Sequence, residues 1–426
     1  MINRVYIETH GCSTNFADGE VIIGCVSKAG YKIVDKPETA DALIFNTCAV
    51  KSPTENRMIS LLKKVPNRKK MIVTGCLPLI NFKRLSEEVS FDAALGPSPG
   101  KSIVTALKRV SRGEKIIDLR DNAMPPSLLP KTTINRMISI LPTSYGCLGS
   151  CSYCCVRKAR GRLRSYSIED ILARLRRDLE AGAKEVWLTS QDTGAYGKDI
   201  GENLIKLLDE VIEQKGEFLV RIGMMNPNHA IEMLHELTDI YKHQRIYKFI
   251  HIPVQSGDNE VLRSMNRGYT VEDFKEVVEA FRKEMPEITL STDIICGFPS
   301  ETEEAYERSV HLLQEIKPDV LNVSKFFARP NTPAKRMKPL PVHVINERSK
   351  NIAELHRRIG LEKNRKWLRW AGSVFVNNFK RGSWVGRNIA YKPVVLDTRR
   401  DGLLGEKVKV QIKVAKPTHL VAKCLL

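Results

Sequence analysis

The sequence contains no apolar run long enough to cross a lipid bilayer, and it contains no internal repeat or low-complexity tract. Its first residues, MINRVYIETHGC, lack the basic segment, the long apolar core and the small-residue cleavage site of a secretory signal. These absences predict a cytoplasmic protein that is not embedded in a membrane. In a reducing compartment the ten cysteines are expected to be metal ligands, reactive thiols or small core residues rather than disulfides.

Acidic residues are scarce relative to basic ones, with 49 Asp and Glu against 68 Lys and Arg, which leaves a net charge of +19. Such a surplus is typical of proteins that bind a polyanion, and nucleic acid is the leading candidate. A basic surface that only aids solubility would have the same composition. The length of 426 residues is enough for two or three domains with a buried core.

The sequence predicts an α/β fold of three parts. Residues 1–112 alternate short apolar runs with helix-like segments and predict an N-terminal parallel α/β domain. A polar linker at residues 113–135 is followed by a second alternation at 136–370, which predicts a partial, open (β/α)6 barrel. The tail, 371–426, has short strands between turn signals and predicts a small antiparallel β-barrel. Strands are expected at residues 5–8, 42–46, 71–74, 138–143, 185–190, 218–224, 248–254, 289–296 and 320–327, with early helices at 18–29 and 55–64.

Three cysteines of the N-terminal domain each follow an apolar run, namely Cys12 in THGC, Cys48 in FNTC and Cys76 in VTGC. Ligand sites in open α/β sheets lie beyond the carboxyl ends of the strands. We therefore expect these three cysteines to converge at one edge of the sheet. Cys25, by contrast, falls within a helix-like apolar stretch and is expected to be a core residue.

The tail is strongly basic, with eleven Lys and Arg against three Asp and Glu and aromatic residues interleaved among them. This composition is typical of an RNA-binding β module, in which cations hold phosphates and rings stack on bases. A barrel with aromatic core residues and a solvated basic face is the alternative. The candidate RNA-binding residues are Lys380, Arg381, Trp384 and Arg387.

A second set of cysteines, Cys147, Cys151 and Cys154, forms a C-x3-C-x2-C pattern directly after an expected strand. A four-iron cluster held by only three cysteines keeps one iron open to an outside ligand. Tetrahedral zinc with Cys155 or a histidine as the fourth ligand is the competing interpretation. A redox-active C-x2-C pair fits less well, because it leaves the third cysteine without a purpose.

The motif CLGSCSYC at the mouth of a β/α barrel resembles the signature of the radical S-adenosylmethionine enzymes. The resemblance implies that the open iron of a 4Fe-4S cluster chelates the amino and carboxylate groups of S-adenosylmethionine. Reductive cleavage of that cofactor then gives a 5'-deoxyadenosyl radical, which abstracts hydrogen from an unreactive carbon.

Over nearly its whole length the chain is similar to the methylthiotransferases. The similarity is carried by THGC, FNTC and VTGC, then YGCLGSCSYC, HIPVQSGDNEVLRSMNRGYT and STDIICGFPSETEEAY, and finally a basic β module like a TRAM domain. It implies that Cys12, Cys48 and Cys76 hold a second 4Fe-4S cluster, where the inserted sulfur is carried and methylated. One S-adenosylmethionine would donate the methyl group and another would be the radical source.

The resemblance also suggests contacts for S-adenosylmethionine. Related enzymes often have a GGE-like motif after the second barrel strand, where this chain has Gln191 and Asp192 as polar substitutes. Arg221 could bind the carboxylate of the cofactor or pair with an acid inside the barrel. The adenine side is expected at a strand with Asp293 where glycine is usual, and its candidate residues are Ile295, Gly297 and Glu301.

Five basic residues follow the barrel cysteines and are expected to collect phosphates around the base that is modified. A tRNA anticodon loop offers bases that are already single-stranded. A solvated loop, or arginines that serve the cofactor and the cluster, would explain the same run. The residues are Arg157, Lys158, Arg160, Arg162 and Arg164.

Three branches of the methylthiotransferases compete as the nearest match. One modifies a ribosomal protein, one N6-isopentenyladenosine and one N6-threonylcarbamoyladenosine at position 37 of tRNA. The compact length and the segments RIGMMNPNH and SKFFARPNTPAKRM resemble the threonylcarbamoyl branch most. We expect a monomer that needs an electron donor protein and a sulfur source. A non-catalytic iron-sulfur RNA-binding protein is the alternative of another class, but it leaves the missing fourth cysteine of both sets unexplained.

Overall fold

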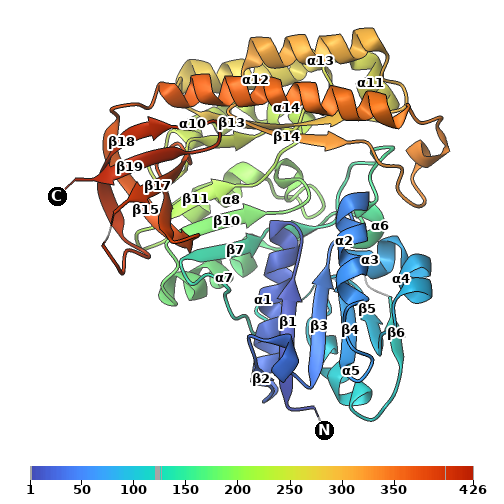
Figure 1. Cartoon of the computed structure of the whole chain (residues 1–426). Helices are drawn as coiled ribbons and strands as arrows, with labels where there is room; N and C mark the ends of the chain where they lie inside the picture. The colour runs from blue at the N-terminus through green and yellow to red at the C-terminus, as the bar shows by residue number, and fades with distance from the viewer. Residues whose placement is uncertain (1, 120–124, 126, 399, 426) are drawn as a thin grey trace.

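The computed structural model describes residues 2–119, 125, 127–398 and 400–425 and consists of three parts (Figure 1). An N-terminal α/β domain, in blue, lies against a central barrel, and a small red β-barrel closes one end of that barrel (Figure 1). No described helix combines the length and the apolar character that crossing a lipid bilayer requires. The α/β fold class predicted from the sequence is confirmed.

The N-terminal domain contains a parallel sheet of six strands in the order β2-β1-β3-β4-β5-β6. The predicted strands and helices of this region are confirmed to within a few residues, and Cys25 lies in the core at 4 % exposure. Its strands are β1 (Arg4–Thr9), β2 (Lys32–Ile33), β3 (Ala42–Thr47), β4 (Lys70–Gly75), β5 (Ala93–Leu95) and β6 (Ile116–Asp118). Its helices are α1 (Ser13–Lys28), η1 (Pro37–Thr39), α2 (Ser52–Leu62), α3 (Cys76–Ile80), α4 (Phe82–Glu88) and α5 (Ser102–Val110).

The boundary that we predicted after residue 112 lies inside this domain, because β6 pairs with β5 and extends the sheet to Asp118. The predicted linker, 113–135, falls partly on residues 120–124 and 126, which lie outside the described residues. The C-terminal part of the predicted linker, which the structure describes, packs against the rest of the chain. Leu129 is 5 % exposed, and Lys131 pairs with Asp178 at 2.7 Å.

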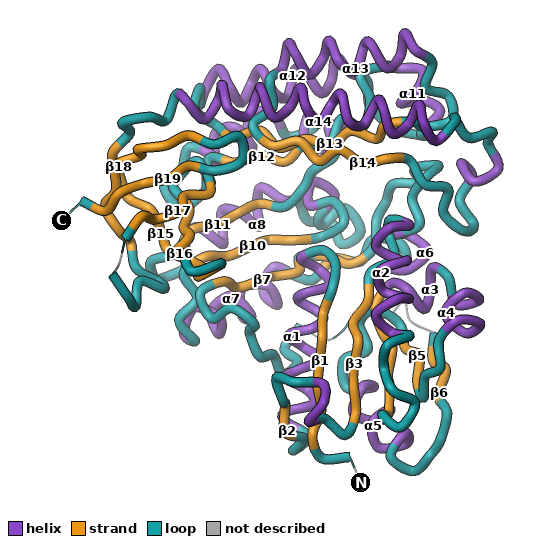
Figure 2. The backbone as a smooth tube through the Cα atoms, viewed as in Figure 1, coloured by secondary structure: helices purple, strands orange, loops and turns teal. Residues whose placement is uncertain are grey.

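The central domain has the six predicted barrel strands, arranged as two parallel sheets in the orders β11-β10-β7 and β12-β13-β14. Figure 2 shows helices along the outside of these strands. The strands are β7 (Ile138–Pro142), β10 (Glu185–Thr189), β11 (Leu219–Ile222), β12 (Phe249–His251), β13 (Thr289–Cys296) and β14 (Val320–Lys325), with a small pair β8 (Ser144–Tyr145) and β9 (Arg164–Ser165). The helical segments are α6 (Val156–Arg160), α7 (Ile168–Glu180), η2 (Thr193–Ala195), α8 (Leu204–Ile212), α9 (Pro227–Ile231), α10 (Leu234–Tyr241), α11 (Asn259–Ser264), α12 (Val271–Glu284), α13 (Glu303–Ile316), η3 (Pro333–Arg336) and α14 (Val342–Arg365).

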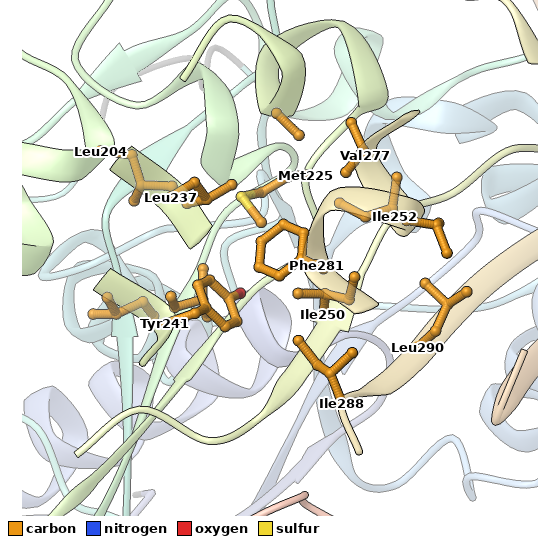
Figure 3. Packing of buried hydrophobic residues seen from close by; sticks show 14 of the residues in the cluster. Leu204, Met225, Leu237, Tyr241, Ile250, Ile252, Val277, Phe281, Ile288 and Leu290 are labelled. Atoms are coloured by element: carbon orange, nitrogen blue, oxygen red, sulfur yellow. The ribbon is translucent and has the colours of Figure 1, made fainter. Parts of the chain in front are cut away.

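The apolar core of the central domain lies between the strands and the surrounding helices. Side chains of α10 and α12 pack there against strand residues, as Tyr241, Phe281 and Ile250 show in Figure 3. Because side chains alternate along a strand, the residues between the core positions face the other way. On β11, for example, Val220 and Ile222 are core residues, and Arg221 between them lies on the barrel interior.

The C-terminal domain is the predicted small barrel, closed in the order β15-β16-β17-β19-β18. All its pairings are antiparallel except β17 with β19, which is parallel. The domain is fixed to the central barrel by Lys392, whose Nζ lies 2.7 Å from Asp319 Oδ1, and by the backbone of Ile389, which accepts from Lys248 N at 2.8 Å. Its strands are β15 (Ala371–Lys380), β16 (Ser383–Arg387), β17 (Pro393–Asp397), β18 (Lys407–Ala415) and β19 (Leu420–Cys424).

Candidate functional site

Cys12, Cys48 and Cys76 converge at one edge of the N-terminal sheet, as the sequence predicts. They follow β1, β3 and β4, which are neighbouring strands, and Cys76 is the first residue of α3. The three thiols are close enough to influence one another electrostatically. Parallel strands therefore deliver three thiols from distant parts of the chain to one place.

Two glycines allow the strand ends to approach this closely. Gly11 has a φ of +124°, and a Cβ there would stand 2.9 Å from the Cβ of Cys48. Gly75 has a φ of +94°, and a Cβ there would collide with the backbone of Thr47. Both the backbone angle and the space thus require glycine directly before Cys12 and Cys76.

Burial makes two of these thiols, those of Cys48 and Cys76, hard to ionise in the absence of a metal, whereas Cys12 is exposed. Desolvation raises the pKa of Cys48, and it raises the pKa of the Cys76 thiol to about 12. A bound metal ion reverses this preference, because thiolates are its ligands. The donor set therefore fits a site that is completed by a cation.

Arg160 is the cation that the structure places beside the strand-end cysteines. Its side chain is 2 % exposed, its Nη1 lies 2.6 Å from Asp18 Oδ2, and its Nη2 donates to Asn15 Oδ1 at 3.0 Å. It acts electrostatically on the thiols of Cys76 and Cys48. The prediction that Arg160 binds RNA is wrong for this structure, because its guanidinium is buried between the two domains.

Cys147, Cys151 and Cys154 lie in the loop between β8 and α6, and each sulfur accepts one N–H hydrogen bond. Gly149 N lies 3.3 Å from Cys147 Sγ, Arg267 Nη1 lies 3.0 Å from Cys151 Sγ, and Val156 N lies 3.4 Å from Cys154 Sγ. Burial also raises the pKa of Cys154 to about 12. N–H donors aimed at sulfur stabilise thiolates and tune iron-sulfur clusters, so this loop fits a cluster with three protein ligands.

The cysteine sets are spaced too widely for a single ion. Among the described residues, no three Cys, His, Asp or Glu side chains are grouped closely enough to hold one metal ion. A cubane takes each cysteine on a different iron, so its ligands need not meet at a common point. Cys155, considered above as a zinc ligand, instead packs in the N-terminal core, with its Sγ 3.8 Å from Val50 O.

Helix α6 joins the two cysteine sets. It begins directly after Cys154 and Cys155 and ends at Arg160, beside Cys76. It contacts α3 of the N-terminal domain, and the two helices lie near each other in Figure 1. A second link connects the ends of α1 and β10, where Ser13 Oγ and Thr189 Oγ1 lie 2.9 Å apart. The two cysteine sets are thus held on facing edges of two domains.

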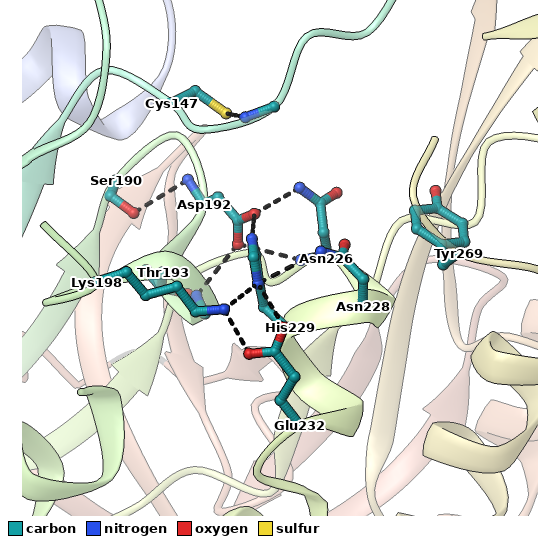
Figure 4. A network of polar contacts seen from close by, with 12 residues as sticks. Cys147, Ser190, Asp192, Thr193, Lys198, Asn226, Asn228, His229, Glu232 and Tyr269 are labelled. Carbon is teal, nitrogen blue, oxygen red and sulfur yellow. Dashed lines mark hydrogen bonds and ion pairs between the residues drawn. The ribbon is translucent and has the colours of Figure 1, made fainter. Parts of the chain in front are cut away.

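A polar network around Asp192, Asn226 and His229 lies near Cys147 (Figure 4). Arg267 contacts Cys151 and also hydrogen-bonds Asn226 Oδ1. Asn226 Nδ2 donates to Asp192 Oδ2 at 2.6 Å, and His229 Nε2 lies 3.7 Å from the same oxygen. Asp192, a predicted cofactor contact, is therefore coupled to the cysteine loop through side chains that we did not single out from the sequence.

The other predicted cofactor contacts fall in different surroundings. Gln191 Nε2 donates to Thr14 Oγ1 at 3.4 Å, and its Oε1 is buried without a partner among the described residues. Ile295 lines a cavity of about 220 Å³ together with Tyr153, Cys154 and Asp293. Both residues remain close to the cysteine loop or to the domain boundary that faces it.

Gly297 and Glu301 instead stabilise the turn after β13. Gly297 N donates to Glu301 Oε1 at 3.0 Å, and Arg348 Nη1 lies 2.7 Å from the same oxygen. Glu301 is 3 % exposed and its carboxylate is occupied by these contacts. The structure therefore corrects the expectation that Glu301 contacts the cofactor directly.

Arg221 lies among aromatic rings on the barrel interior. Its guanidinium carbon is 5.4 Å from the ring centre of Trp187, 5.3 Å from that of Phe249 and 5.6 Å from that of Tyr391. The buried acid of this region, Glu185, accepts from Trp187 Nε1 at 2.6 Å instead. Pairing of Arg221 with an acid, one of the two possibilities considered from the sequence, is not found among the described contacts.

The remaining candidate RNA contacts form two groups. Lys158 and Arg162 are exposed beside the cysteine loop, whereas Arg157 and Arg164 are partly buried and donate to backbone carbonyls. In the C-terminal barrel, Lys380 and Arg381 are exposed at the turn between β15 and β16. In the same barrel the rings of Trp384 and Phe379 are 4.6 Å apart, and Arg387 stacks on Tyr391 at 4.5 Å.

Sequence reasoning missed Asn15, Asp18, Asn226 and Arg267. Each lies inside or next to a segment that was singled out for other reasons, such as RIGMMNP and RSMNRGYT. Their proximity to cysteines became visible only in three dimensions. Asn226 follows the expected strand at 218–224 by two residues, whereas Asn15, Asp18 and Arg267 lie farther from a strand end or a cysteine motif and had no such local signal.

Comparison with known proteins separates two parts of the chain. Residues 141–313 match the Radical SAM superfamily, and residues 4–96 match the uncharacterized protein family UPF0004. Among solved structures, the radical S-adenosylmethionine methyltransferase TsrM from Kitasatospora setae superposes with a TM-score of 0.56 at 14 % identity, covering 88 % of this chain and 77 % of that one. The cobalamin-dependent enzyme OxsB gives 0.54 at 13 % identity, covering 83 % and 56 %. At these identities the likeness concerns the fold alone.

Relatives of higher identity extend over the whole chain. The probable threonylcarbamoyladenosine tRNA methylthiotransferase of Pyrococcus horikoshii is 44 % identical over 99 % of both chains. The threonylcarbamoyladenosine tRNA methylthiotransferases of Drosophila melanogaster and Homo sapiens are each 35 % identical, covering 99 % and 96 % of this chain and 78 % and 72 % of those proteins. With two sets of three cysteines on facing domain edges and identity of this extent, the chain belongs to the threonylcarbamoyladenosine tRNA methylthiotransferase family.

Proposed function

We propose that the protein inserts a methylthio group at C2 of N6-threonylcarbamoyladenosine at position 37 of tRNA. The reaction replaces the C2 hydrogen by SCH3 and gives 2-methylthio-N6-threonylcarbamoyladenosine. The activity named for relatives that match nearly the whole chain supports the substrate, and the Radical SAM match supports the type of chemistry.

The observation that carries the proposal is the pairing of two incomplete cysteine sets across one domain boundary. Cys147, Cys151 and Cys154 would hold the cluster that binds S-adenosylmethionine, and Cys12, Cys48 and Cys76 the auxiliary cluster. When bound, these groups would supply the electron, the radical and the methylated sulfur. The connection through α6 and Arg160 fits a reaction in which both centres must reach one substrate atom.

The residues of the chain itself position and enclose these groups. Arg267 and the backbone N–H groups of Gly149 and Val156 hold the barrel sulfurs in place. Asn226 orients Asp192 at the end of β10, where a polar contact to the amino group of S-adenosylmethionine is expected. Ile295 supplies an apolar wall beside Cys154 for an adenine ring.

We assign RNA binding to exposed basic residues near the cysteine loop and on the C-terminal barrel. Lys158 and Arg162 flank the cysteine loop, and Lys380 and Arg381 extend from the C-terminal barrel. Between the barrels lies a cavity of about 730 Å³ whose lining includes Lys184, Arg245, Arg387 and Lys407. Such a basic cleft suits the phosphates of a tRNA anticodon arm.

The experiment is mass spectrometry of tRNA nucleosides from cells that contain N6-threonylcarbamoyladenosine and N6-isopentenyladenosine but lack their methylthio derivatives. Expression of the wild-type chain is expected to produce 2-methylthio-N6-threonylcarbamoyladenosine. Cys147→Ala and Cys48→Ala should each abolish that product, because each removes one ligand of one cluster. Cys424→Ala, which removes a thiol of β19 far from both sets, should leave it unchanged.

Other results of this experiment would contradict the proposed substrate or the proposed reaction. A methylthio-isopentenyl product from the wild-type chain would contradict the proposed substrate, and no new nucleoside would contradict tRNA methylthiolation. Product formation by Cys48→Ala would show that the auxiliary site does not need this cysteine.

Several partners and properties are proposed along with the activity. Reductive cleavage of S-adenosylmethionine needs an electron donor protein, and the inserted sulfur needs a source. We place the enzyme in the cytoplasm, where tRNA is abundant, and expect it to act as a monomer, since three domains of one chain already surround the centre. Size-exclusion chromatography with light scattering would test the oligomeric state.

A further inference from the structure

The guanidinium of the half-buried Arg221 stands in a box of three aromatic rings, and no ion pair with it is found among the described residues. Trp187, Phe249 and Tyr391 surround it at 5.3 to 5.6 Å. Its Nε is buried and has no hydrogen-bond partner among the described residues. Rings hold an arginine in place by its face and leave the N–H groups at its edge available.

This box opens into a cavity of about 540 Å³ where all three domains meet. The N-terminal domain contributes Gly11 and Ser13, which flank Cys12, and the C-terminal barrel contributes Asn378, Arg387 and Tyr391. A volume of this size suits a small-molecule group such as a modified base. Among the described residues, none from the loop that carries Cys147, Cys151 and Cys154 lines this cavity. The cavity therefore lies on the side of the auxiliary cysteines.

The charges around the cavity do not neutralise Arg221. The acid on its wall, Glu20, lies 3.4 Å from Lys131 Nζ and accepts from Ile134 N. Glu185, near the rings, accepts hydrogen bonds from Trp187, Tyr247 and Asn377. Arg387, on the same wall, adds a second positive charge. No acid of the described residues pairs with Arg221, so the cavity suits an anionic ligand.

We propose that Arg221 binds the carboxylate of the threonylcarbamoyl group on the substrate adenosine and thereby selects this base over adenosines without the group. The inference rests on the proposed function. The threonylcarbamoyl substituent ends in a carboxylate, and the planar fork of an arginine matches that shape with two parallel hydrogen bonds. In this arrangement the substituent on N6 extends into the cavity. C2, which ring atom N1 separates from C6, then points to the edge of the domain that carries the cysteines.

The test measures the binding of two anticodon stem-loops to the reconstituted holoenzyme by fluorescence anisotropy. One stem-loop carries N6-threonylcarbamoyladenosine at position 37 and the other carries unmodified adenosine. Wild type should prefer the modified stem-loop by about 10- to 100-fold, the range of a buried charge-assisted contact. Arg221→Gln should bind both with the affinity that wild type has for the unmodified one, and Arg221→Lys should retain part of the preference.

Lys83→Gln is the matched control, since it removes one positive charge at a side chain that is 85 % exposed on α4. It should keep the full preference. Equal weakening of both stem-loops by Arg221→Gln would identify a phosphate contact and overturn the inference. Loss of affinity for S-adenosylmethionine with an unchanged preference would assign Arg221 to the cofactor and also overturn it.

A substrate-side experiment avoids any dependence on how the variant folds. Wild-type holoenzyme is offered a stem-loop whose threonylcarbamoyl carboxylate is converted to the neutral amide. The preference should fall by the same factor as in Arg221→Gln, and an undiminished preference would refute the role of the carboxylate. Failure of the proposed function is seen separately, as a missing product in the wild-type nucleoside assay.

Discussion

At the scale of single residues, the contact between Arg267 and the barrel cysteines carries a testable consequence. Arg267 Nη1 donates a hydrogen bond to Cys151 Sγ at 3.0 Å, and Arg267 Nη2 donates one to Asn226 Oδ1. Loss of a partner that orients a metal ligand typically costs about 10- to 100-fold in activity or metal affinity. We expect Arg267→Met to reduce 5'-deoxyadenosine formation by that factor, measured anaerobically with S-adenosylmethionine and a reductant.

The control for this prediction lies four residues earlier. Arg263 on α11 is 70 % exposed, and among the described residues its only ion pair is with Glu260 at the surface. Arg263→Met should keep wild-type rates and iron content. Equal activity of Arg267→Met and wild type would show that the hydrogen bond to Cys151 is dispensable.

At the scale of elements, the turn from β4 into α3 depends on Gly75. Its φ of +94° and the closeness of the Thr47 backbone leave no room for a methyl group. Gly75→Ala should displace Cys76 and reduce the iron content from two clusters to one, while the cluster of the barrel loop persists. Iron and sulfide analysis with electron paramagnetic resonance of the anaerobic protein measures this.

Gly30 provides the comparison, because its φ of +89° is similar and a Cβ there would meet nothing within 4 Å. Gly30→Ala includes the backbone strain but not the collision, so it should retain both clusters. Two clusters in Gly75→Ala would mean that the strand end tolerates the shift.

At the scale of the whole molecule, the net charge of +19 predicts tRNA binding that weakens steeply with salt. The exposed pair Lys380 and Arg381 projects from the C-terminal barrel. If both contact phosphates, Lys380→Gln/Arg381→Gln should lower the slope of log affinity against log salt by about two. Binding titrations between low and physiological salt measure the slope.

Two exposed lysines elsewhere serve as the charge-matched control. Lys83 on α4 and Lys350 on α14 are 85 % and 75 % exposed. Lys83→Gln/Lys350→Gln should leave the slope unchanged. If both double variants behave alike, the C-terminal barrel has no special part in holding the phosphates.

Much of the fold could be predicted because its signals are local. Each barrel strand is a short apolar run between helix-like segments, and the observed strands match the expected ones within a few residues. The convergence of Cys12, Cys48 and Cys76 was also predictable, since adjacent parallel strands end at one edge. The pairing of β6 with β5 was missed, because a three-residue strand has too little apolar pattern.

The environments of charged side chains could not be predicted in the same way. Arg160 and Arg162 stand in one basic run, yet the first is 2 % exposed beside Asp18 and the second is exposed. Glu301 fitted a family pattern but is paired with Arg348. Each outcome depends on which distant residue arrives opposite, and a basic run looks the same in either case.

The sequence by itself determined the candidate cluster ligands and the architecture: two sets of three cysteines, placed where strands end, in a chain of two β/α parts and a basic β-barrel. Only the tertiary structure decided that the two sets lie on facing edges, that Arg160 is buried beside Cys76, and that Arg221 stands among aromatic rings with no ion pair among the described residues. The physical reason is the distance along the chain between the residues that interact. Backbone patterns and strand ends follow from neighbours along the chain, whereas the burial and pairing of a charge depend on contacts between domains.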